Sequence, residues 1–318
     1  MQVLLLVMLG CAKEPPVEEP AAIPEATSKE TPADPPAELS SFVGQPVALR
    51  IRDLKLDLDG VEVLVQSLVG RLEPRGEVVD LEDPTTFTVE IEALELRIPE
   101  QSIAGALKGP DGASTPVKDV SVRTEGDAFV VEGSVRPLGV PFVFRADPVV
   151  TDDGKLALDL EKVKLLGIGL RGFLSTFERP VENTVNRGPR RGLLNVEEDR
   201  LIVDPFPFAG PPEVHARFTS FEVDETGLVA RLGESPDAEG WPHGLTLAGG
   251  ALRTGNTVLF GSTVSLIALD GKARLTLDPA RLEDQISNGF SKLQGENVTL
   301  YLAPPEGPEI KPPTGSPP

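Results

Sequence analysis

The chain has 318 residues, of which 50 are acidic and 30 basic, so its formal net charge at pH 7 is −20. This excess of acid argues against nucleic acid as a partner, because phosphate backbones are bound by clustered Lys and Arg. With one cysteine and two histidines, the chain offers no internal disulfide and little material for a metal site, and we expect neither a metal nor another cofactor.

The N-terminus carries a short apolar run, residues 2–10, that ends at the single cysteine, Cys11. In a bacterial lipoprotein signal a small residue, here Gly10, precedes a cysteine that then carries acyl chains. No Lys or Arg precedes Cys11, a departure that a start further upstream would explain; the alternative is a buried cysteine at a frayed terminus. We predict a signal peptide over residues 1–10 and a lipidated Cys11. This places the protein in the bacterial cell envelope, in the outer membrane facing the periplasm or the cell surface.

Residues 12–40 are rich in Pro and Glu and nearly free of large apolar side chains. Such a segment cannot bury enough apolar surface to offset the entropy lost on ordering, so residues 11–40 are predicted to form a disordered tether. Residues 304–318 have the same composition and predict a disordered tail. The folded domain is expected over residues 41–303, which is long enough for one large core or two smaller ones.

Between Val47 and Leu302 the dominant pattern is the alternation of apolar and polar residues that predicts strands with one buried face. Short turn sequences, several of them Asp-Gly, separate the alternating runs and suit tight hairpins. The pattern therefore predicts long antiparallel strands. The turn dipeptides lie at residues 59–60, 125–126, 153–154, 226–227 and 270–271.

Helical spacing is found in three segments, residues 99–108, 170–186 and 278–294. The first and the third each follow an alternating strand, so residues 94–107 and 275–286 suggest two degenerate halves. Strands and helices together predict an α+β fold, in which a long, strongly curved antiparallel sheet wraps around amphipathic helices.

Motifs for enzyme chemistry are weak in this sequence. Residues 167–172 read G-x-G-x-x-G, but the flanking runs alternate and residues 187–191 lack the acid that a dinucleotide site needs. His215 falls on the polar face of a strand and His243 in a loop, and no hydrolase or zinc signature accompanies them. We therefore expect no enzymatic activity.

The apolar face of the expected sheet needs a cover, and three modest helices are few for so many strands. One interpretation is that an acyl chain completes the seam between sheet and helices. The alternative is that the curved sheet closes the core on itself. The side chains expected to line the lipid site are Phe142, Phe144, Leu166, Leu170, Phe173, Leu174, Phe177, Val181, Ile103, Leu107, Ile286 and Phe290.

Five arginines form an island of positive charge on or just after the second helical segment. Arginine suits phosphate groups, so these residues are candidates for binding a lipid headgroup. The alternative is a solvated helix face balanced by Glu178 and Glu182. The five candidates are Arg171, Arg179, Arg187, Arg190 and Arg191.

We expect a short helix over residues 98–107. After it come strands that end at residues 144, 158 and 168, then the amphipathic segment 170–186, and then a strand over residues 200–205. In this order of elements the stretch 117–232 resembles the LmeA-like phospholipid-binding family of exported bacterial proteins, which have a tubular lipid-binding (TULIP) fold. The resemblance implies a sheet wrapped around a long helix, with an apolar groove for phospholipid acyl chains.

We expect a membrane-anchored, non-enzymatic lipoprotein that binds phospholipid or a similar acyl-chain ligand. Carrying this ligand in lipid transport would be a further role of the same protein. The alternative is a structural or protein-interaction lipoprotein, with a fully self-packed core, that docks another envelope protein.

Overall fold

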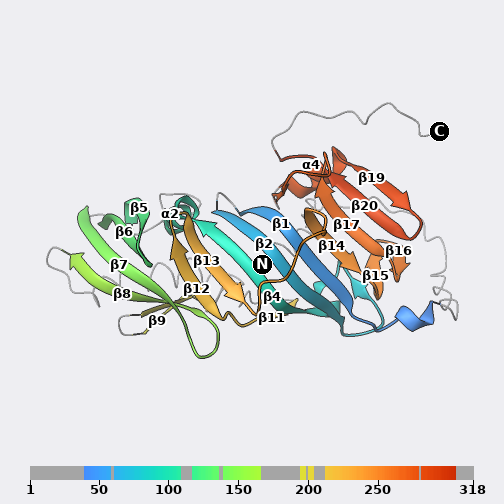
Figure 1. Ribbon diagram of the computed structural model, residues 1–318, viewed down its shortest axis with the longest axis horizontal. Coiled ribbons are helices and arrows are strands. Elements are labelled where there is room, and N and C mark those ends of the chain that lie inside the picture. The colour runs from blue at the N-terminus through green and yellow to red at the C-terminus, as the bar shows by residue number, and fades with distance from the viewer. Residues whose placement is uncertain are drawn as a thin grey trace, which may run out of the picture.

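The computed structural model describes residues 39–58, 61–108, 117–135, 139–165, 194–197, 200–203, 212–278 and 281–305. These residues form three sheets and few helical turns (Figure 1). The predicted signal peptide, Cys11 and the helical segment 170–186 lie outside the described residues, as do nearly all of the predicted tether and tail.

The main sheet contains eleven strands. Its strand order is β12 (Ser220–Asp224), β13 (Gly227–Leu232), β4 (Phe87–Pro99), β2 (Val61–Pro74), β1 (Val47–Leu58), β14 (Gly244–Ala248), β17 (Thr263–Ala268), β20 (Asn297–Leu302) and β19 (Phe290–Gln294). In addition, β11 (Glu213–His215) pairs with β4, and β18 (Leu275–Leu277) pairs with β1.

A second sheet, here called the side sheet, lies at the β12 end of the main sheet (Figure 1). Its order is β5 (Val117–Glu125), β6 (Ala128–Val135), β7 (Val140–Val150), β8 (Leu156–Leu165), β10 (Arg200–Val203) and β9 (Leu194–Glu197). A small sheet joins β16 (Thr257–Phe260), β15 (Ala251–Thr254) and β3 (Val79–Asp80). The described helices are α2 (Glu100–Lys108), α4 (Leu282–Ser287) and the 3-10 turns η1 (Ser40–Phe42) and η2 (Pro84–Thr86).

Alternation dictates which face of the main sheet is buried. In β1, Leu49 and Ile51 are buried and Arg50 is exposed, as the sequence predicts. The alternation breaks at Asp53, which has a φ of +47°, and opposite it Gln66 is an extra residue in the β2–β4 ladder. Each bulge adds one residue to its strand, which reverses the face that the following side chains point to. The apolar residues beyond the bulge therefore lie again on the buried face.

The polar face of the main sheet is crossed by the connection between β13 and β14, residues 233–243 (Figure 1). Ser235 donates a hydrogen bond to Glu95 on β4 at 3.0 Å, and Arg52 on β1 donates to the backbone oxygen of Trp241 at 2.9 Å. Arg50 lies over the Trp241 ring, 5.4 Å from its centroid. These contacts fix the connection on the polar face, opposite the main core.

The expected α+β fold with a sheet wrapped around amphipathic helices is wrong. Among the described residues strands dominate, and the two α-helices, α2 and α4, are only 9 and 6 residues long. Much of the apolar cover comes from β-structure instead: the small sheet adds Val79 and Leu252 to the main core, and the side sheet packs at the β12 end. The helix expected at 99–108 is confirmed as α2.

The helix expected over residues 278–294 is shorter than predicted. It ends at Ser287, and residues 290–294 form β19, paired antiparallel with β20. A Cβ on Gly289 would lie 2.0 Å from the backbone oxygen of Tyr301, so the chain can approach β20 this closely only at glycine. The apolar spacing that predicted a continuous helical stripe thus spans a helix, a glycine and a strand.

Most pairs of described strands are antiparallel, as predicted, but four of these pairs are parallel: β1 with β18, β4 with β11, β17 with β20 and β3 with β15. The turns at 125–126, 153–154 and 226–227 join antiparallel neighbours as predicted. The turn at 270–271 does not, because β17 pairs with β20 and β18 pairs with β1.

Candidate functional site

Three of the predicted lipid-binding residues meet between the side sheet and the β12 end of the main sheet. Phe142 on β7 is 2% exposed, and its ring stacks on that of Phe144 with centroids 5.8 Å apart. Ile103 of α2 packs against the same cluster, called here the second core. Gly133 on β6 leaves room for the Phe142 ring, since a Cβ there would lie 2.7 Å from its Cζ.

Among the described residues, a smaller share of the second core is buried than of the main core of the large sheet, which is called here the first core. Among the described residues, the first core has 25 buried and 10 partly buried apolar residues, whereas the second has 7 buried and 8 partly buried ones. More than half of its apolar side chains therefore keep some exposure. The partly buried members are Ile98, Ile103, Val122, Phe144, Leu156, Leu158, Phe221 and Val223.

Two other predicted residues lie at the opposite end of the molecule. Phe290 on β19 stacks on Tyr301 at a centroid distance of 4.3 Å, and Ile286 of α4 is 47% exposed. Both are remote from β7 along the main sheet, so the structure does not bring them together with Phe142 (Figure 1).

The other predicted site residues cannot be placed in this way. Leu107 belongs to α2, but its side chain is not among those described. The remaining lipid-site and headgroup candidates lie outside the described residues: Leu166, Leu170, Phe173, Leu174, Phe177, Val181, Arg171, Arg179, Arg187, Arg190 and Arg191.

An open cleft of about 880 Å³ lies where α2, the β12–β13 turn and the polar face of the main sheet meet. It adjoins the second core, because Val122 lines the cleft and also packs against that core. The cleft has both apolar and charged walls. Its lining residues are Leu64, Gln66, Arg97, Pro99, Glu100, Gln101, Val122, Asp224, Glu225, Thr226 and Arg274.

An ion pair between Arg97 and Asp224 forms one wall of this cleft. Asp224 accepts hydrogen bonds from the Thr226 amide at 2.8 Å and the Thr226 hydroxyl at 2.7 Å. Burial acts to raise the pKa of the Asp224 carboxyl, but these hydrogen bonds, and then Arg97, outweigh it and lower the pKa from 3.8 to about 2. The Asp224 carboxyl is therefore ionised at neutral pH.

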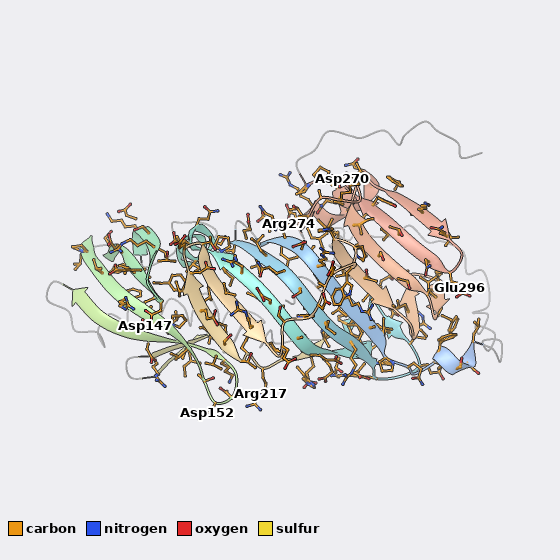
Figure 2. The ribbon with its side chains drawn as sticks, viewed as in Figure 1. Asp147, Asp152, Arg217, Asp270, Arg274 and Glu296 are labelled. Atoms are coloured by element: carbon orange, nitrogen blue, oxygen red, sulfur yellow. The ribbon has the colours of Figure 1, made fainter. Side chains whose placement is uncertain are left out.

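The second arginine of the cleft, Arg274, immediately precedes β18 and lies at the upper edge of the main sheet (Figure 2). It is exposed and makes no ion pair with any residue in the described ranges. The sequence analysis missed Arg97 and Arg274. One sequence feature could have pointed to Arg97. The polar positions of β4 before it are acidic, at Glu90, Glu92 and Glu95, so Arg97 is the cation that ends this series.

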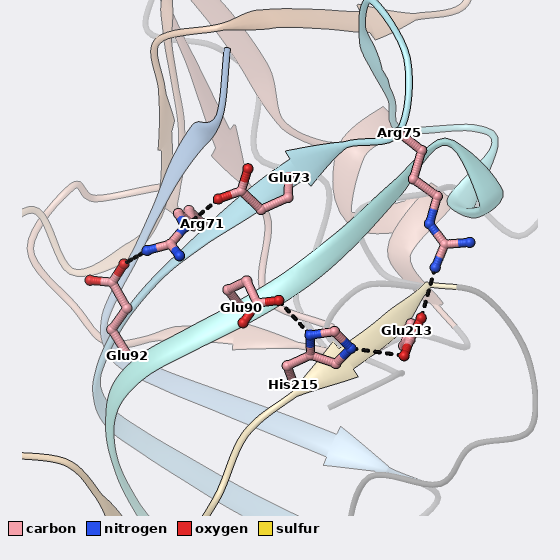
Figure 3. A network of polar contacts seen from close by, with 7 residues as sticks. All are labelled: Arg71, Glu73, Arg75, Glu90, Glu92, Glu213 and His215. Carbon is pink, nitrogen blue, oxygen red and sulfur yellow. Dashed lines mark hydrogen bonds and ion pairs between the residues drawn. The ribbon is translucent and has the colours of Figure 1, made fainter. Parts of the chain in front are cut away.

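A network of charged side chains covers β2, β4 and β11 on the polar face (Figure 3). His215 contacts Glu90 through Nδ1 and Glu213 through Nε2, the latter at 2.8 Å, and Arg75 pairs with Glu213 at 2.9 Å. Hydrogen bonds to Glu213, and then to Glu90, raise the pKa of the His215 imidazole above its ordinary 6.5. His215 is 48% exposed, which confirms its predicted place on a polar face.

A metal site does not emerge from this network, since no group of three or more His, Cys, Asp or Glu side chains suited to a metal occurs among the described residues. In the same residues, no helix has both the length and the apolar character that crossing a membrane requires.

Comparison with known proteins leaves the chain without an assigned family. No family model matches it, and no curated protein and no solved structure is found to be similar to it. The resemblance of residues 117–232 to the LmeA-like family therefore stays a prediction.

Proposed function

We propose that this protein is a lipid-anchored, non-enzymatic protein of the bacterial cell envelope that binds the acyl chain of a phospholipid in its second core. The observation that supports the proposal is that, among the described residues of that core, partly buried apolar side chains outnumber buried ones. An acyl chain lying against these side chains would remove their remaining apolar surface from water, at about 25 cal/mol per Å².

The experiment is native mass spectrometry of the purified protein, compared between two matched variants. Leu158→Gln places an amide in the second core, and Leu300→Gln places the same amide at a partly buried position against the first core. We expect bound phospholipid in the native protein and in Leu300→Gln, and its loss in Leu158→Gln. Circular dichroism and urea unfolding verify that both variants are folded.

Equal lipid retention in the two folded variants would contradict the assignment to the second core. A native protein that is repeatedly free of lipid would contradict lipid binding altogether. That outcome would favour the second candidate, a protein-interaction lipoprotein. One observation supports it: Ile286 and Leu293, the large apolar side chains exposed among the described residues at 47% and 74%, both lie at the β19 end.

A further inference from the structure

β19 is the last strand of the main sheet, at the end opposite the side sheet (Figure 1). Its five residues pair with β20 without a shift in register, and no described strand pairs with its other edge. It contains neither the Pro nor the bulge that protects many edge strands, and Lys292 is its single charge. The edge is therefore open to pairing with a further strand.

The turn of the β19–β20 hairpin determines which backbone groups face this open edge. Residues 295–296 form a two-residue turn that closes on the pair of Gln294 and Asn297. In such a hairpin the closing pair is hydrogen-bonded, and hydrogen-bonded and non-hydrogen-bonded pairs alternate along the strands. Ser291 and Leu293 therefore direct their N–H and C=O groups away from β20.

Leu293 also brings apolar surface to the open edge. It is 74% exposed, and it lies on the same face of the sheet as Val298, the residue opposite it on β20. Val298 packs against the first core, so the apolar face of that core continues as far as the edge. A strand that placed an apolar residue opposite Leu293 would remove this surface from water.

We infer that this edge binds the same edge of a second copy of the chain, antiparallel and with Leu293 on the twofold axis between the copies. The two Leu293 side chains then cover each other, and their outward N–H and C=O groups pair across the axis. Lys292 lies diagonally across from Glu296 of the other copy, within reach of a long side chain. Both charges are exposed and have no partner in the part of the chain that the structure describes, so this arrangement gives each of them an opposite charge.

Other antiparallel registers fit this edge less well. An axis at Lys292 would place two ammonium groups directly opposite each other, which destabilises a sheet. An axis at Ser291 would place Leu293 opposite Gly289, which has no side chain to cover it and lies where the chain leaves α4. Five residues in each copy form a small interface, so we expect a weak dimer, with a Kd on the order of 10–100 μM.

The test is sedimentation velocity of the full-length chain with Cys11→Ala, from about 1 μM to about 1 mM. Lys292→Glu and Glu296→Lys should each weaken dimerisation about threefold to tenfold, because each places like charges across the axis. The two substitutions change the net charge in opposite directions, so weakening by both cannot come from net charge. Combining them in one chain restores opposite charges across the axis and should restore the native Kd.

Matched controls are Lys118→Glu and Glu239→Lys, which make the same changes at exposed positions away from β19 and should dimerise as the native chain does. Circular dichroism verifies that every variant is folded. A chain that is monomeric at every concentration, or a double variant no stronger than the single ones, would overturn the inference. Lipid binding in the second core does not depend on this edge, so either result would leave the proposed function standing.

A second measurement tests the register. In the chain with Cys11→Ala, Leu293→Cys supplies a single thiol next to the axis, and a short bis-maleimide should join two copies through it. Ser291→Cys should be joined far less, because its thiols would lie about 14 Å apart by the usual rise of a strand. Equal joining at both positions would overturn the assignment of the axis to Leu293.

Discussion

At the scale of single residues, the polar face is organised by charge pairs whose partners come from distant parts of the sequence. His215 connects β11 to β4 through Glu90, and Glu213 connects β11 to the end of β2 through Arg75. Beside them on the same face, Arg71 of β2 pairs with Glu73 and with Glu92 of β4. Because β11 pairs with β4 over only three residues, these ion pairs add side-chain contacts that join it to β4 and to the end of β2.

A pH dependence follows from His215. Its pKa is raised in the folded state, so its stabilising contribution is fully present below the unfolded pKa near 6.5 and is lost as pH rises through the higher folded value. The side chain is half exposed, so the effect should not exceed about 1 kcal/mol. Urea midpoints measured across this range should decline with pH in the native chain and decline less in His215→Gln. His243→Gln serves as the control, and identical profiles for all three proteins would refute the prediction.

At the scale of elements, alternation predicted the strands well because one face of each strand is buried. Residues 47–51 and 54–58 each alternate between apolar and polar side chains, and the structure joins these two runs into β1 across the bulge at Asp53. The helix expected over 278–294 is present as α4, but its predicted second half is wrong: a period of 3.6 residues fits Leu282, Ile286 and Phe290 even though β19 begins at Phe290. Only the pairing of β19 with β20 decides between helix and strand, and that contact is not local.

The candidate site was predicted in part. Phe142, Phe144 and Ile103 were expected together and do meet in the second core. Arg97 and Arg274 were not expected together, because they are far apart in the sequence and become neighbours of one cleft only through the order of β4, β2, β1 and β18. Alternation within one strand predicts which of its side chains are buried. Which side chains line a cleft depends on the order of the strands in the sheet, which alternation does not predict.

A test at this scale concerns the corner where β14 leaves the main sheet for β15. Gly250 has a φ of +56°, and a Cβ there would lie 2.6 Å from the backbone oxygen of Gln45. Gly250→Ala should lower the free energy of unfolding by about 1–3 kcal/mol, because both the conformation and the contact are strained. Gly76→Ala, where a Cβ meets nothing within 4 Å, should leave it unchanged or slightly raised. Equal urea midpoints for the two variants would show that the corner tolerates a side chain.

At the scale of the whole molecule, the predicted lipid anchor at Cys11 is the feature that would hold this acidic protein at a membrane surface. If Cys11 carries acyl chains, each buried CH₂ contributes about 0.8 kcal/mol, and two or more chains hold the protein there durably. Cys11→Ala should then move the protein from the membrane fraction to the soluble fraction, as measured by fractionation and immunoblotting. A variant that still sediments with membranes would show that another contact retains the protein.

The order of strands in the main sheet also bears on biosynthesis. β1, β2 and β4, which are made first, occupy its middle, and later strands extend it on both sides, with β12 and β13 beyond β4 and β14, β17, β20 and β19 beyond β1. A chain that emerges with its N-terminus first thus exposes two open sheet edges until its last third has emerged, and such edges favour aggregation. We expect productive folding to depend on chaperones that shield those edges until the C-terminal strands arrive.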